Sequence, residues 1–249
     1  MRNDAELLTI MFNGAGVRVQ TLNLHHLELA KREPAFRASI ESATWVTADG
    51  WPVRRAFNAL GYRTERVTGY DFVSNLLNDG RTRSKALGLL GASPNVATRF
   101  KHLTDDLGIQ LVYSDQRRRE EWNVRSIVDE LNRASVDILM VAVTPPWGDL
   151  IANEIFESGF QGNVIAVGGA IDIATGQQSK GPDFVGKFGL VWLYRMIREP
   201  KRLFARYIFR CLPVMILDVI PIEIGAKIKR RGKAVQVRVT AHTADKELA

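Results

Sequence analysis

The stretch Val136–Val143, VDILMVAV, carries a single charged residue, Asp137, among seven apolar ones. A strand can bury such a run only if both of its faces are covered, as in a parallel sheet with helices on either side. The stretch therefore predicts a fully buried strand at the centre of the chain.

Short apolar runs alternate with helical patterns on both sides of this strand. The expected strands are Val17–Gln20, Ser42–Thr47, Lys85–Leu90, Ile109–Tyr113 and Asn163–Val167; the expected helices are Trp51–Leu60, Pro94–Leu107, Glu120–Ala134 and Ile151–Ser158. Strand–helix alternation is typical of an α/β fold with a parallel sheet. We expect a Rossmann-like domain over residues 1–178, with a mainly parallel sheet and helices on both faces.

The composition is close to that of an average globular protein, with 249 residues of which 46% are hydrophobic and 24% charged. One cysteine, Cys211, excludes a disulfide framework and a cysteine-based zinc site and favours a reducing compartment. The N-terminus carries Asp4 and Glu6, unlike a signal peptide, and no apolar run reaches the roughly 18 residues of a membrane span. These features predict a cytoplasmic protein.

The positive charge of the chain is concentrated near its C-terminus. The net charge is +7, but residues 180–238 alone carry +10, interleaved with aromatic residues. Such a composition is typical of a segment that lies on an anionic membrane surface. We therefore expect a basic, aromatic, amphipathic helical appendage over residues 179–249, peripherally attached to the inner face of the cell membrane.

Within this appendage we expect helices over Phe184–Arg198 and Lys201–Arg210, separated at Pro200. The following stretch Cys211–Ile224 is apolar but contains Pro213, Asp218 and Pro221. Because these residues interrupt the apolar run, we expect that this stretch cannot form a regular membrane span.

Polar residues and glycines follow several predicted strands, where open α/β sheets bind ligands. They are Thr21 and Asn23, Asp49, Arg66 and Asp71, Gly91, and Gly168, Gly169 and Asp172. Each also has a purely structural explanation: a helix cap, an Asp-Gly turn, an Arg66–Asp71 salt bridge, or close packing at glycine. The four histidines lack metal-ligand spacing and no paired-aspartate DxD motif is present, so we expect no metal.

These motifs in combination resemble those of the WecG/TagA/CpsF glycosyltransferases over roughly residues 7–210. The resemblance rests on Thr21-x-Asn23 opening a helix, Thr47-Ala-Asp49-Gly50, Arg66-Val-x-Gly69-x-Asp71, VDILMVAV, Gly168-Gly169-Ala-x-Asp172 and the closing FGLVWLYRMIREPKRLFARY. It implies inverting transfer of a hexose-type sugar from a UDP-sugar to a polyprenyl-pyrophosphate-linked saccharide. The implied context is exopolysaccharide or other cell-surface polysaccharide synthesis, with no cofactor or metal.

The resemblance also implies roles for individual residues. Asp49 would be the catalytic base and Thr21 its active-site partner. Asn23, Asp71, Gly91, Asp149, Gly168, Gly169 and Asp172 would bind substrate, and Arg66, Arg195, Arg202 and Arg206 would contact diphosphate or membrane. In the family a Pro-x-Gln-Glu segment usually follows the VDILMVAV-type strand, whereas here Thr144–Asp149 reads TPPWGD and lacks the glutamine.

Two other classes of protein compete with the glycosyltransferase. A non-enzymatic nucleotide-binding module could use its basic tail for nucleic acid or membrane, although the resemblance implies no nucleic-acid partner. A Rossmann oxidoreductase should carry Gly-x-Gly-x-x-Gly after its first strand, but Asn13-Gly-Ala-Gly16 precedes the wrong element. The sequence leaves the sugar, the linkage and the oligomeric state open, a homo-oligomer included.

Overall fold

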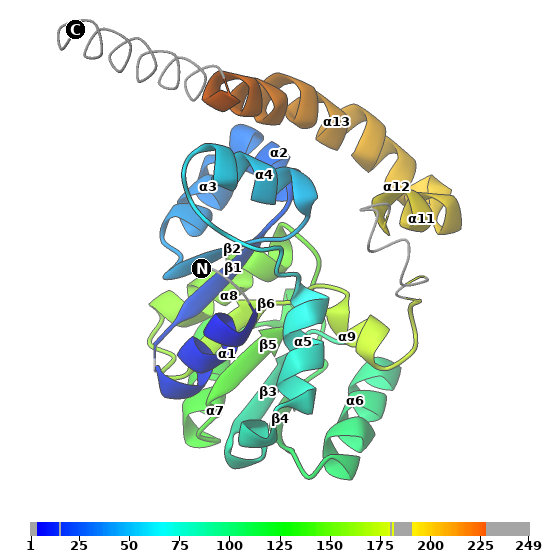
Figure 1. Cartoon of the computed structure of the whole chain (residues 1–249). Helices are drawn as coiled ribbons and strands as arrows, with labels where there is room; N and C mark the ends of the chain where they lie inside the picture. Colours follow the sequence, from blue (N-terminus) through cyan, green and yellow to red (C-terminus); the bar gives the residue numbers. More distant parts are fainter. Residues whose placement is uncertain (1–3, 15, 180, 182–190, 228–249) are drawn as a thin grey trace, which may run out of the picture.

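The computed structural model describes residues 4–14, 16–179, 181 and 191–227, and its centre is a six-stranded sheet (Figure 1). The strands are β1 (Arg18–Leu22), β2 (Trp45–Ala48), β3 (Ala86–Leu90), β4 (Gln110–Asp115), β5 (Ile138–Val141) and β6 (Asn163–Ala166). Their order is β2-β1-β6-β5-β3-β4 and every neighbouring pair is parallel. The predicted Rossmann-like α/β fold is confirmed.

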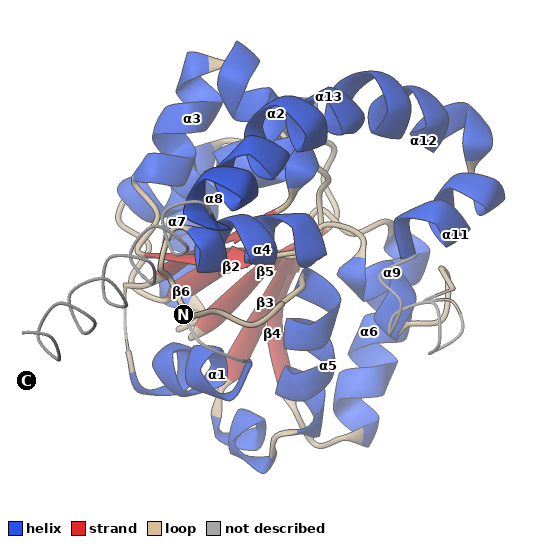
Figure 2. Ribbon diagram, turned by 45° about the horizontal axis from the view of Figure 1, so that its top comes forward, coloured by secondary structure: helices blue, strands red, loops and turns tan. Residues whose placement is uncertain are grey.

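Helices cover both faces of this sheet (Figure 2). They are α1 (Asp4–Asn13), α2 (Leu24–Arg32), α3 (Pro34–Glu41), α4 (Trp51–Ala59), α5 (Gly69–Asn78), α6 (Pro94–Asp106), α7 (Val124–Arg133), α8 (Trp147–Glu157) and α9 (Ala170–Ala174), with short 3-10 turns η1 (Gly80–Ser84) and η2 (Arg119–Glu121). Along β5, Ile138 and Met140 belong to one hydrophobic core, while Leu139 and Val141 belong to the other. This alternation explains why the sequence of β5 is continuously apolar.

Some predicted boundaries shift by up to a turn of helix. The helix expected from Glu120 begins at Val124, because the Asn123 side chain accepts a hydrogen bond from the Ser126 N–H and caps it. The helix expected from Ile151 begins earlier, at Trp147. Strand β5 ends at Val141, before the cis Pro145–Pro146 bond.

The C-terminal part of the described chain is helical almost throughout. It comprises α11 (Val191–Arg198), α12 (Pro200–Ala205), η3 (Arg206–Cys211), α13 (Leu212–Val214), η4 (Met215–Val219) and helical residues 220–227. The part of the first expected helix before Val191 lies outside the described residues, and Pro200 separates α11 from α12 as expected. Among the described residues, no helix combines the length and apolarity that a membrane crossing requires.

The stretch Cys211–Ile224 is helical despite its two prolines. Both η3 and η4 are π-helical turns, and they precede Pro213 and Pro221. A proline ring clashes with the carbonyl four residues earlier and offers no N–H to it. A wider π turn moves that carbonyl and lets a later N–H take it, so the helix continues past both prolines.

The C-terminal helix lies across α2 and α4 (Figure 1). The Lys31 ammonium of α2 contacts the Asp218 carboxylate at 2.7 Å. The half-exposed Arg55 of α4 pairs with the buried Glu223 of the C-terminal helix. At its base, the Gln178 amide donates to Glu199 at 2.7 Å. The appendage is thus attached to the two helices that follow β1 and β2, while the domain division at residue 178 stays a prediction.

Candidate active site

The carboxyl ends of β1 and β2 bring Asn23 and Asp49 together. Leu22 is in register with Ala48, so the next residue of each strand emerges at the same edge of the sheet. The Asp49 N–H donates to the Leu22 carbonyl at 2.8 Å, and the Asn23 side-chain N–H donates to Asp49 Oδ2 at 3.1 Å. Gly50, at φ 112°, then turns the chain into α4 through a conformation that favours glycine.

The environment of Asp49 perturbs its acidity. Burial raises the pKa of this half-buried carboxyl, while the Asn23 hydrogen bond and the positive charge of Arg66 act in the opposite direction. A carboxylate with a raised pKa is a stronger proton acceptor than one in water, provided that it is ionised. The geometry at Asp49 thus suits a general base.

Asn23 itself is held firmly as the N-cap of α2. Its Oδ1 accepts the backbone N–H groups of His25 and His26 at 3.0 and 3.3 Å, which leaves its side-chain N–H groups for Asp49. Its own backbone N–H donates to His26 Nδ1 at 3.2 Å. Asn23 therefore caps α2 and also contacts Asp49, while its binding of substrate stays a prediction.

A buried polar group lies behind this edge and was not predicted. Gln20 Nε2 donates to Asp149 Oδ1 at 2.7 Å, and His26 Nε2 lies 3.4 Å from the same oxygen. Asp149 is 1% exposed, so its carboxylate faces these side chains inside the protein, and its direct contact with substrate stays a prediction. A glutamine amide does lie beside Asp149, but β1 supplies it rather than the segment Thr144–Asp149.

Two sequence signals could have revealed Gln20 and His26. Gln20 is a polar residue inside a strand whose other residues are all buried. His26 is the third residue of the helix capped by Asn23, the position from which a side chain can reach back to the cap.

The Arg66–Asp71 pair takes the structural form that the sequence left open. Arg66 lies 3.1 Å from Asp71 Oδ2, and Asp71 also accepts the Thr68 N–H in a capping box that starts α5. A bridge between Ala48 and Arg66 places the half-exposed guanidinium next to the strand that leads into Asp49.

Of the remaining predicted residues in the sheet domain, some lie near Asp49 and one lies far from it. Gly168 (φ 53°) and Gly169, the N-cap of α9, follow β6, the strand next to β1. From β1, the hydroxyl of buried Thr21 donates to the Ala166 carbonyl of β6 at 3.5 Å. Asp172 lies in the first turn of α9, where burial raises its pKa. Gly91 follows β3, four strands from β2, which corresponds to about 19 Å at the usual strand spacing.

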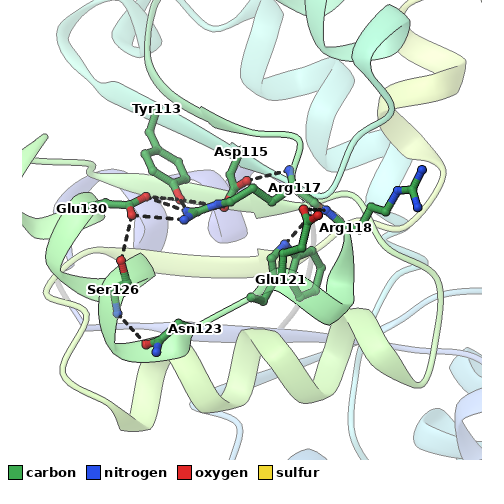
Figure 3. Close-up of polar contacts among 9 residues, drawn as sticks. Tyr113, Asp115, Arg117, Arg118, Glu121, Asn123, Ser126 and Glu130 are labelled. Carbon is green, nitrogen blue, oxygen red and sulfur yellow. Dashed lines mark hydrogen bonds and ion pairs between the residues drawn. The ribbon is translucent and has the colours of Figure 1, made fainter.

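Gly91 lies beside a second polar cluster, which the sequence analysis did not identify (Figure 3). Arg117 bridges Asp115 and Glu130 at 2.6 and 2.7 Å, and the Tyr113 hydroxyl donates to the same carboxylates. The Arg117 carbonyl in turn accepts the indole N–H of Trp122, whose ring lies where a Cβ at Gly91 would meet it, at 3.3 Å. The cluster fixes the loop after β4 against the turn after β3.

The appendage brings Arg206 toward α2. Burial, and secondarily the charge of Arg206, lowers the pKa of His25 to about 3, so this histidine is neutral at physiological pH. Arg195 and Arg202 belong to α11 and α12, and their predicted contacts stay predictions. In the described ranges, no three or more His, Cys, Asp or Glu side chains form a group that could hold a metal ion.

Comparison with known proteins identifies the family of the chain. The family model described as "Glycosyl transferase WecG/TagA/CpsF family" matches residues 4–228. A relative from Bacillus spizizenii, named N-acetylglucosaminyldiphosphoundecaprenol N-acetyl-beta-D-mannosaminyltransferase, is 26% identical over 177 residues, covering 70% of this chain and 68% of its own. The family match extends over the sheet, the Asn23–Asp49 edge and most of the described appendage, and on that evidence the chain belongs to the WecG/TagA/CpsF family of glycosyltransferases.

Proposed function

We propose that this glycosyltransferase moves a sugar from a UDP-linked donor to a saccharide carried on a polyprenyl pyrophosphate, with inversion at the anomeric carbon. The product would enter cell-surface polysaccharide synthesis. The acceptor class is suggested by the name of the Bacillus relative, an N-acetylglucosaminyldiphosphoundecaprenol N-acetyl-beta-D-mannosaminyltransferase. We further propose that the transferred sugar is of the hexose type and that the pathway makes an exopolysaccharide.

The observation that carries the proposal is the Asp49 carboxylate at the sheet edge, aimed by Asn23 and raised in pKa by burial. Inverting transfer is a single displacement, in which the acceptor hydroxyl attacks the anomeric carbon as the bond to UDP breaks. The hydroxyl must lose its proton as it attacks, and a positioned carboxylate can take it. Asp49 would hold that proton after the transfer.

The departing UDP needs its growing negative charge stabilised. In this proposal the Gly169 N–H, at the N-cap of α9, and the Arg66 guanidinium share that task. Thr21 of β1 and Asp172 of α9 would lie beside the diphosphate. The proposed mechanism uses no metal or cofactor.

A lipid-linked acceptor would require the enzyme to work at a membrane surface. Along the outer side of the C-terminal helix, several apolar side chains are exposed, among them Phe209 at 70% and Leu217 at 68%. Arg206, Arg210 and Lys227 lie on the same helix. Apolar residues combined with basic ones favour attachment to an anionic membrane surface, and we propose that this helix makes it.

UDP release from a panel of UDP-sugars, with a polyprenyl-pyrophosphate saccharide present or absent, tests the function. We expect acceptor-dependent release with at least one donor and its abolition in Asp49→Asn. Acceptor-independent release at the same rate would indicate hydrolysis and contradict the proposed transfer.

A further inference from the structure

The buried side chains behind β1 form a chain of contacts that ends at Asp49. Gln20 and His26 both contact Asp149, His26 accepts the backbone N–H of Asn23, and Asn23 donates to Asp49. His26 is 3% exposed and stacks on the fully buried Phe36, with 5.9 Å between ring centroids. None of these groups behind Asn23 is open enough to touch a substrate.

The contacts define the proton on His26. Its Nδ1 accepts the Asn23 N–H and therefore carries no proton. A neutral imidazole then has its proton on Nε2, the atom that faces Asp149 Oδ1 at 3.4 Å. A carboxylate behind a histidine fixes the ring's tautomer and its orientation in the same way in many enzymes.

Asp149 is suited to this holding role. Its charge is balanced by buried Arg18, whose pKa is lowered by burial and raised in turn by Asp149 and Glu157. Its other oxygen, Oδ2, is buried with no hydrogen-bond partner among the described residues. Such a buried carboxylate is costly without partners, so the hydrogen bond from Gln20 and the contact with His26 Nε2, both at Oδ1, hold these side chains in place.

We propose that His26, held by Asp149 and Gln20, is a positioning residue that orients Asn23 and through it the Asp49 carboxylate. At this third position of a helix, Glu or Gln usually reaches back to the cap. Here His26 accepts the N–H of the cap residue Asn23 and also contacts the buried Asp149 carboxylate. The rigid imidazole ring thus connects Asp149 to Asn23, which contacts Asp49. The inference rests on the proposed function of Asp49.

Two substitutions at His26 separate positioning from simple packing. His26→Phe keeps a ring on Phe36 but removes both nitrogens, whereas His26→Gln offers an oxygen to the Asn23 N–H and an amide to Asp149. We expect His26→Phe to lower kcat by ~10- to 100-fold with an unchanged donor KM, because a small displacement of a catalytic group costs that much. We expect His26→Gln to recover most of the loss.

The pH profile gives a readout that packing alone would not move. The Asn23 hydrogen bond lowers the pKa of Asp49. Loosening this bond in His26→Phe should raise that pKa and shift the acid limb of kcat to higher pH. Gln20→Met removes the amide that donates to Asp149 and should shift the acid limb in the same direction by a smaller amount. This variant replaces His26→Phe in the test if His26→Phe does not fold.

Thr82→Val is the matched control. It removes the hydrogen bond from the buried Thr82 hydroxyl to the Leu76 carbonyl, before the amino end of β3 and away from the site. It should lower the melting temperature and leave kcat and the pH profile unchanged. A wild-type pH profile in both His26→Phe and Gln20→Met, with Asp49→Asn inactive, would overturn the positioning role alone; an active Asp49→Asn would overturn the function on which it rests.

Discussion

Asn23 donates its side-chain amide to Asp49 across 26 residues of sequence, at 3.1 Å. The contact exists because β1 and β2 are neighbours, run parallel and end at matching positions of the register. Each residue is also the first after its strand, where the chain turns into a helix. The sheet itself thus places the proposed base, Asp49, next to the side chain that would orient it.

Replacing the base should abolish turnover without harming the fold. We expect Asp49→Asn to lower kcat by at least ~10²-fold, the usual scale of general base catalysis, with donor binding retained. Since burial raises the pKa of Asp49, its ionised form destabilises the folded state at neutral pH, and the melting temperature should not fall. Steady-state kinetics and thermal denaturation measure both; turnover near that of the wild type would remove Asp49 from the mechanism.

The pH dependence of the reaction should reflect the raised pKa of Asp49. The base works only when ionised, so kcat should fall as pH drops through a pKa that lies above the usual aspartate value. Asn23→Ala removes the hydrogen bond that lowers this pKa, so its acid limb should move to higher pH. A limb at the same pH in both proteins would mean that Asn23 does not act on the base.

The outer side of the C-terminal helix should govern attachment to vesicles. We expect Phe209→Ser combined with Leu217→Ser to weaken binding to anionic vesicles by ~10-fold or more, since each buried apolar side chain contributes about 1.5–3 kcal/mol. Val112→Ser, an exposed apolar residue on β4, is the control and should bind like the wild type. Sedimentation with vesicles at increasing salt measures the charge contribution, which is screened beyond ~8 Å at physiological ionic strength. Unchanged vesicle binding in the double variant would show that this side of the helix does not attach the protein to the membrane.

The arginines of the appendage should matter even without a membrane. On a short-chain, water-soluble acceptor, we expect Arg202→Ala and Arg206→Ala each to lower activity by at least ~10-fold, because a charge-assisted hydrogen bond contributes about 1.5–3 kcal/mol. Lys201→Ala, at an exposed neighbouring position, is the control. Full activity of both arginine variants would leave the appendage as a membrane anchor only.

Activity is expected to survive chelation with EDTA, because the proposed mechanism stabilises the leaving diphosphate with backbone N–H groups and arginine. The rate should be compared before and after chelation and after returning Mg²⁺ or Mn²⁺. A strict, saturable requirement for either ion would contradict this prediction.

The sheet was predictable from sequence because its strands are buried on both faces, as the alternating cores of Ile138 and Leu139 illustrate. Asn23 and Asp49 were predictable because polar residues directly after buried strands gather at one edge. The order of the strands decides which of these residues meet, and it placed Gly91 far from Asp49. Nothing local in the sequence encodes that order.

Two features escaped prediction for different physical reasons. Gln20 and His26 contact Asp149, more than 120 residues away, so their role depends on long-range packing of α8 against β1. The helix through Pro213 and Pro221 was missed because proline usually ends a helix. Here the π turns η3 and η4 absorb the distortion, and contacts with α2 and α4 add to the stability of the helix.

The three ion and hydrogen-bond contacts that attach the appendage also give its helix a polarity across its width. Within the described residues 191–227, the acidic side chains are Glu199, Asp218 and Glu223, and each contacts Gln178, Lys31 or Arg55 of the preceding domain. Its negative charge is therefore turned inward. A half-turn roll of the helix would break the ion pairs of Asp218 and Glu223 and expose the buried Val214 and Val219, so charge and packing together select one rotational setting of the helix.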